Sequence, residues 1–166
     1  MLDDYLLDFW EKELSLSEEE EVLSLEIFGR PYMYTLTERE FMQLSPEDQE
    51  KAMEEVIETG REIRSYMKSV IVEAESFEAN KDYMNAEAYF VYCLEIGREL
   101  SINKDGLFIT RMVGISCEKD GLNGLVNLYT ETGDNSKLQM AYEQLWEIEQ
   151  EVEEMRRTAK ATETQS

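Results

Sequence analysis

The chain has 166 residues, of which 38 are acidic and 16 basic, so its net charge is −22. Such a surface disfavours nucleic acid and anionic membranes as direct partners, because affinity for phosphate comes mainly from Lys and Arg. The chain contains no His, which removes the commonest general base and metal ligand. Apolar residues make up 42% of the chain, enough for a folded core.

The first part of the chain, residues 1–44, is expected to form an N-terminal appendage. Residues 2–14 have the apolar spacing of a short amphipathic helix. Residues 22–36 alternate and contain a Gly-Arg-Pro turn, which predicts a small hairpin. Large side chains in this part form either a surface that packs on the helical domain, which we favour, or a homodimer interface. They include Phe9, Trp10, Tyr32 and Tyr34.

A helical domain is expected over residues 45–157. The Thr37–Glu40 motif is typical of a capping box that opens a short preceding helix. Ser45-Pro46 is a stronger helix start, because Ser caps the end and Pro suits the first helical position. Apolar and small residues then recur in steps of four and three, which predicts a helix to about Asn80. Gly60 lies inside this helix and marks either a tolerated glycine or a break.

Further helices follow, over about 83–100, 107–118 and 136–157. Asp120-Gly121 is expected to start or interrupt another helix, which lies between those over 107–118 and 136–157. The tail, 158–166, is small and polar and is expected to be disordered. The sequence thus predicts a mainly α protein, either an antiparallel helical bundle or a superhelix of helix pairs. Turn-forming residues separate the helices at 80–82, 103–106 and 133–136.

The spacing of small and aromatic residues around the turn at 81–83 is similar to that of a known family of helical repeats. Small residues let paired helices approach closely, and aromatic residues fill the space beyond them. The stretch from about 66 to 150 resembles tetratricopeptide repeats, with a second candidate turn at Gly133-Asp134. An ordinary antiparallel bundle, which produces similar spacing, stays as the alternative. The residues that carry the resemblance are Ala74, Phe77, Lys81-Asp82-Tyr83, Ala86, Phe90 and Cys93.

This resemblance implies a groove lined by the first helix of each pair, in which a segment of a partner protein is held. By the resemblance, the groove would take residues from two helices. They are Lys68, Ile71, Glu75 and Glu78 from the first, and Phe108, Arg111, Ile115 and Glu118 from the second.

Catalytic and metal-binding motifs are not recognisable. The glutamate clusters lie off the apolar stripes, and a two-metal bundle site would need His. We therefore expect no enzyme activity, no cofactor and no metal. The leading hypothesis is a protein-interaction module, which is a monomer or a homodimer and whose partner is another protein. If the negative charge serves recognition and not only solubility, this partner is basic. The alternative is an acidic mimic of nucleic acid that inhibits a DNA- or RNA-binding protein.

The compartment is inferred from the cysteines and from the start of the chain. Cys93 and Cys117 lie inside apolar helical patterns, so we expect buried, reduced thiols. The first residues lack the basic segment of a signal peptide, and no apolar run approaches the ~20 residues that span a bilayer. We expect a cytoplasmic protein.

Overall fold

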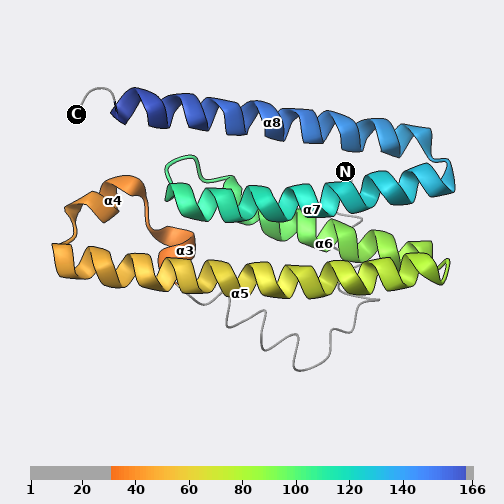
Figure 1. The fold of residues 1–166 in the computed structure, drawn as a ribbon, viewed down its shortest axis with the longest axis horizontal. Coiled ribbons are helices and arrows are strands. Elements are labelled where there is room, and N and C mark those ends of the chain that lie inside the picture. Colours follow the sequence, from red (N-terminus) through yellow and green to blue (C-terminus); the bar gives the residue numbers. More distant parts are fainter. Residues whose placement is uncertain (1–30, 164–166) are drawn as a thin grey trace.

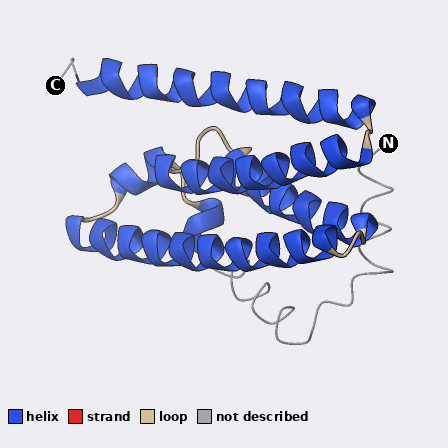
Figure 2. Ribbon diagram, turned by 45° about the vertical axis from the view of Figure 1, so that its right-hand side comes forward, coloured by secondary structure: helices blue, strands red, loops and turns tan. Residues whose placement is uncertain are grey.

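The computed structural model describes residues 31–163, which form helices joined by short loops (Figures 1 and 2). The described part contains no strand, since Thr37 and Gly106 form only an isolated bridge. The expected mainly α class is confirmed. The helices are α3 Pro31–Thr35, α4 Glu38–Gln43, α5 Pro46–Ala79, α6 Tyr83–Ser101, α7 Phe108–Thr132 and α8 Asn135–Glu163.

The long helix α5 begins and ends where the sequence predicts. The Ser45 side chain accepts a hydrogen bond from the Asp48 N–H, and Pro46 occupies the first turn, where its missing N–H costs nothing. The helix is 34 residues long, or about 50 Å at 1.5 Å per residue. It runs unbroken through Gly60, so this glycine is tolerated rather than a break. At the far end, Lys81 adopts a positive φ of 61° in the turn to α6.

Helices α6 and α7 approach each other closely because glycines line their contact. A Cβ added at Gly114 would lie 2.5 Å from the carbonyl oxygen of Gly97. A Cβ at Gly121 would lie 2.6 Å from the carbonyl oxygen of Phe90. The expected interruption at Asp120-Gly121 is therefore wrong, because Gly121 allows a close helix contact inside one continuous helix, α7.

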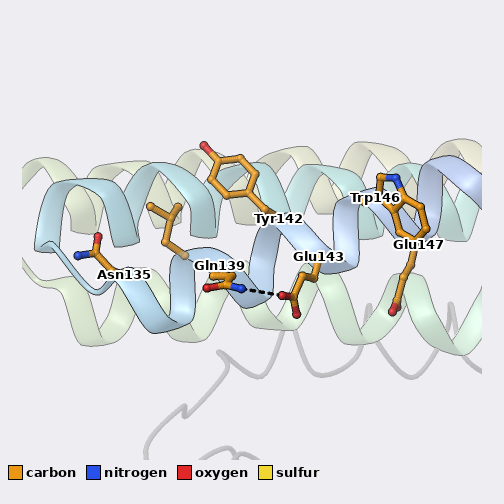
Figure 3. Close-up of a pocket in the computed structure, with 7 residues that line it drawn as sticks. Asn135, Gln139, Tyr142, Glu143, Trp146 and Glu147 are labelled. Atoms are coloured by element: carbon orange, nitrogen blue, oxygen red, sulfur yellow. Dashed lines mark hydrogen bonds between the residues drawn. The ribbon is translucent and has the colours of Figure 1, made fainter.

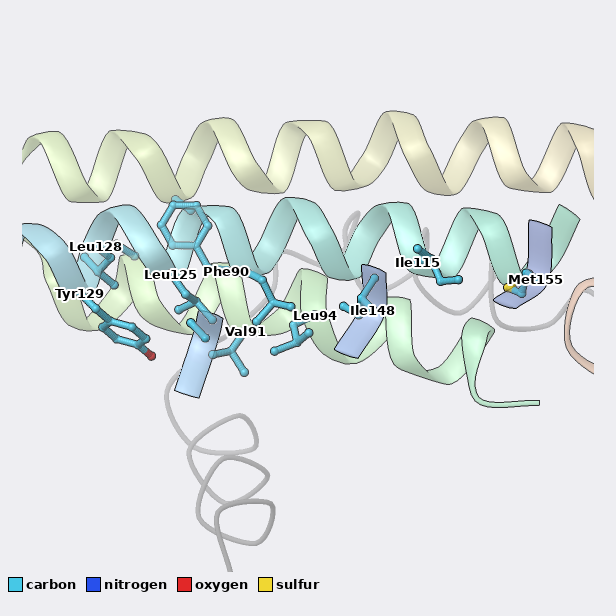
Figure 4. Close-up of a cluster of buried hydrophobic side chains, with 13 residues drawn as sticks. Phe90, Val91, Leu94, Ile115, Leu125, Leu128, Tyr129, Ile148 and Met155 are labelled. Carbon is cyan, nitrogen blue, oxygen red and sulfur yellow. The ribbon is translucent and has the colours of Figure 1, made fainter. Parts of the chain in front are cut away.

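The helices pack in chain order, with α6 on α5, α7 on α6 and α8 on α7 (Figure 1). Side chains from α6, α7 and α8 meet in one buried cluster, in which Phe90, Val91 and Leu94 of α6 lie beside Leu125 of α7 and Ile148 of α8 (Figure 4). This cluster is the core against which α8 is held.

Helix α8 is longer than expected. It follows a left-handed Gly133, whose φ is 73°, and continues to Glu163. The expected disordered tail is wrong for residues 158–163, which continue α8. Within this part the Thr158 hydroxyl donates to the Glu154 carbonyl one turn earlier.

The chain before α5 forms two short helices, α3 and α4, both of which contact α5. The predicted strand ending at Leu36 is wrong, because residues 31–35 are helical. The helical conformation allows the Met33 side chain to be buried, since it is 2% exposed and packs between α5 and α7. The predicted capping box at Thr37 and Glu40 is confirmed and starts α4. Residues 2–14 and 22–30, for which a helix and a strand were predicted, lie outside the described residues.

Among the described helices, none combines the length and the apolar character needed to cross a membrane.

Candidate functional site

The four expected groove residues on α5 follow one line along the helix, but they differ in exposure. Lys68 and Glu75 are exposed, whereas Ile71 is half-buried and packs on both apolar clusters. Glu78 is half-buried, and burial together with the carboxylate of Glu131 on α7 raises its pKa. Only the exposed positions of this line are open to a partner.

The four expected groove residues on α7 face α6 and α8 instead of α5. Ile115 is buried in the core, and the buried Glu118 accepts a hydrogen bond from the Ser101 hydroxyl of α6. The Arg111 guanidinium donates to Glu151 of α8 at 2.8 Å. Phe108 is 46% exposed at the start of α7. Ile115 and Glu118 therefore cannot line an open groove, and the eight residues are not brought together on one face.

The residues of α7 that do face α5 are shifted by about one position along the sequence from the residues expected to do so. Arg64 of α5 forms an ion pair of 2.7 Å with Asp120 and also donates to the Cys117 sulfur. A Cβ at Gly60 would lie 3.1 Å from Val113. The sequence pattern places residues on a helix face but does not show by itself which neighbour each side of that face meets.

Glu118 is the most deeply buried carboxyl group of the described residues. It is 7% exposed, and burial raises its pKa although Arg98 lies near enough to oppose this. Arg98 itself donates to Glu95 and to Gln144 of α8. Glu118 thus belongs to a polar layer between α6, α7 and α8, and its burial gives it a structural place rather than a place at a surface.

A shallow hollow of about 500 Å³ lies where the start of α7 diverges from the second half of α8. Lys104, Phe108 and Arg111 border it from the α7 side, and Glu151 and Met155 border it from α8. The Arg111–Glu151 ion pair already occupies its polar wall, and the Arg111 side chain is only 14% exposed. This ion pair therefore neutralises the most deeply placed charge of the hollow.

The outer side of α8 carries the most exposed aromatic side chains of the described part. Tyr142 is 55% exposed and Trp146 is 62% exposed. Figure 3 shows both rings projecting from α8, where they border a hollow of about 550 Å³ together with Leu138 and Gln139. All residues that line this hollow belong to α8, so it is a feature of one helix surface that no other part of the described chain covers.

Acidic side chains accompany these aromatic rings. Glu143 and Glu147 line the same hollow, and Glu143 accepts a hydrogen bond from Gln139 at 3.0 Å (Figure 3). Between Leu138 and Met155 the helix carries six acidic residues and no basic one. The surface therefore combines apolar area with negative charge, which is the complement of a basic amphipathic segment.

Sequence reasoning did not single out Tyr142 and Trp146 as candidate site residues, although a signal for their exposure was present. The side chains that α8 buries are spaced in strict steps of three and four, and the two aromatic residues lie beside this series. The series is Leu138, Ala141, Leu145, Ile148, Val152 and Met155.

The residues expected to form a packing surface or a dimer interface are only partly described. Tyr32 is half-buried against the cluster that contains Met33, which places it on the helical domain. Phe9 and Trp10 lie outside the described residues, as does the side chain of Tyr34.

Chemistry at these sites is limited by the groups present. In residues 31–163 no group of three or more acidic or Cys side chains is arranged to hold a metal ion. Both cysteines are fully buried, and burial raises the pKa of each thiol, which disfavours the reactive thiolate. What the α8 surface offers is recognition through apolar contact and charge.

Comparison with known proteins adds no family to this description. No protein-family model, curated protein or solved structure matches the chain.

Proposed function

We propose that this protein is a non-enzymatic interaction module that binds an amphipathic helix of a basic partner protein on the outer face of α8. The observation that carries the proposal is the pair of exposed rings, Tyr142 and Trp146, within an acidic stretch of helix. Trp and Tyr are the residues that most often dominate the binding energy of protein interfaces.

The order of helix packing supports the same surface. From α5 to α8 each helix packs on its predecessor, as in a stack of helix pairs, and tetratricopeptide-like packing is part of this proposal. The last helix of such a stack normally presents a polar outer face. Here α8 presents two large aromatic rings instead, which is the face that a following helix would cover.

Charge determines which kind of helix fits. Glu143, Glu147 and Glu149 are exposed beside or near the rings, and the chain as a whole carries −22. A second copy of α8 would bring like charges together, which opposes self-association. A helix with Leu or Ile on one side and Lys or Arg on the other would cover the rings and place its cations near the carboxylates.

The proposal is tested with two synthetic helical peptides that share one apolar face and carry either Lys or Glu on the polar face. Binding to the full-length chain is measured by isothermal titration calorimetry. We expect the basic peptide to bind and the acidic one not to bind. Trp146→Ala should weaken binding by roughly thirty-fold, the effect of a ~2 kcal/mol hot spot.

Val72→Ala provides the matched control, because Val72 is 63% exposed on α5. It removes exposed apolar area away from α8 and should leave the dissociation constant unchanged. Equal binding of both peptides, or an unchanged affinity in Trp146→Ala, would rule out the α8 face as the site.

A further inference from the structure

The segment 31–44, here called the strap, packs on α5 and on the start of α7. The Met33 side chain enters between α5 and α7, where its end lies over Gly60. The Thr110 hydroxyl of α7 donates to the Met33 sulfur at 3.4 Å. Buried side chains of the same cluster surround it, among them Val56, Ile63 and Leu107.

A second contact ties the strap to the start of α7. Leu107, which precedes the helix, gives α7 no side-chain cap. The cap comes from the strap, because the Glu38 carboxylate accepts a hydrogen bond of 2.8 Å from the Phe108 N–H. A carboxylate at a helix N-terminus is favoured both by the free N–H groups and by the helix dipole. The Glu38 N–H in turn donates to the Asp105 carbonyl at 3.0 Å.

The strap is weakly held compared with the helices beneath it. Its helices have five and six residues, and helices this short are not stable by themselves. Helix α4 has no buried residue, and its contacts with the loop before α7 are exposed hydrogen bonds. Met33 is the one fully buried side chain among the described residues of the strap, while Tyr32, Leu36 and Phe41 are only partly buried against the same cluster. Segments held by so few fully buried side chains and by exposed hydrogen bonds are the kind that open locally.

From this geometry we propose that the pocket between α5 and α7 is a second docking site, which the strap occupies in cis and a partner segment occupies in trans. The partner segment carries an unbranched apolar side chain, Met or Leu, on a helical turn. Five residues later it carries a carboxylate, matching the spacing of Met33 and Glu38. The apolar side chain fills the space over Gly60, and the carboxylate caps α7.

The proposal is tested in the full-length chain with Met33→Asp, which puts a charge in the pocket and releases the strap. The probe is a fluorescein-labelled peptide with the sequence of residues 31–44, and binding is followed by fluorescence anisotropy. We expect the released variant to bind the peptide roughly ten- to hundred-fold more tightly than the unaltered chain, the effect of burying one Met side chain. Peptides carrying Met33→Asp or Glu38→Ala should bind more weakly than the unaltered peptide.

Met42→Asp is the matched control, since Met42 lies on the same strap but is 71% exposed. It should bind no more peptide than the unaltered chain. The proposal is overturned if Met33→Asp keeps its helical circular dichroism without binding the peptide, or if Met42→Asp binds equally well.

Hydrogen exchange of the unaltered chain gives an answer even if Met33→Asp fails to fold. The Glu38 and Phe108 N–H groups should exchange by local opening, faster than the N–H groups in the middle of α6. Exchange of both sets at one common rate would overturn the proposal, because the strap would then open only when the whole domain unfolds.

Discussion

Replacing Gly114 with Ala measures how much the close contact between α6 and α7 contributes to stability. The added Cβ would lie 2.5 Å from the Gly97 carbonyl oxygen and 2.7 Å from the Ser101 nitrogen. Ordinary contacts of a Cβ begin at 3.4 Å, so the helices must separate by about 1 Å. Backbone atoms cannot rotate away as a side chain can. Overpacking of this kind costs up to about 3 kcal/mol, while the change from Gly to Ala inside a helix returns about 1 kcal/mol.

The expected result for Gly114→Ala is a net loss of about 2 kcal/mol, or a melting temperature lowered by roughly 4–8 °C for a chain of this size. Gly60→Ala is the matched control. Its Cβ would meet only the side chains of Val113 at 3.1 Å and Met33 at 3.4 Å, both of which can adjust. It should stay within about 1 kcal/mol of the unaltered chain. Urea and thermal unfolding followed by circular dichroism compare the two. Equal stability of the two variants would refute the reasoning from backbone contact.

Three further predictions concern the buried and acidic groups. Glu118→Gln keeps the acceptor for the Ser101 hydroxyl but removes a buried charge, so it should stabilise the chain by on the order of 1 kcal/mol near pH 7.5. Because the folded pKa of Glu118 is raised, the unaltered chain loses stability as pH rises through that pKa, and the advantage of Gln should disappear in urea titrations near pH 4. A constant advantage across this range would contradict the assignment. The pKa values of Glu78 and Glu99 are also raised, first by burial and then by neighbouring carboxylates. Thermal unfolding should therefore show a higher melting temperature at about pH 5.5 than at about pH 7.5. Added salt should raise the melting temperature at the higher pH. A melting temperature that falls on mild acidification would show that paired carboxylates dominate. Finally, Cys93 and Cys117 should resist alkylation by iodoacetamide in the native chain and react in urea, as mass spectrometry can count. Full labelling without urea would show that α6 and α7 open easily.

The helix boundaries were largely predictable because local chemistry sets them. The helix starting at Pro46, the capping box at Thr37 and the turn at Gly133 all follow from residues close in sequence. Two predictions failed where tertiary contacts override the local signal. Residues 32–36 have strand-forming side chains but adopt a helical turn that buries Met33. Gly121 resembles a break, yet it serves a close helix contact.

The candidate site was less predictable because it depends on which neighbour each helix face meets. The pattern placed Arg111 and Glu118 on one face of a helix, as the structure does, but could not indicate that α6 and α8 cover this face. Exposure of Trp146 was available from spacing alone, since the residue lies beside the series that ends at Met155. The pocket filled by Met33 was not predictable, because it joins three elements that are distant in sequence.

The packing of each helix on its predecessor also has a kinetic consequence. Contacts between chain neighbours close short loops, and proteins dominated by such contacts fold quickly. The α6–α7 hairpin, with its glycine contact and a connection of six residues, is the pair that can form first, and α5 and α8 can then add to either side. A newly synthesised chain would therefore have its central hairpin in place before its last helix is complete, and α8 would dock on a surface that already exists.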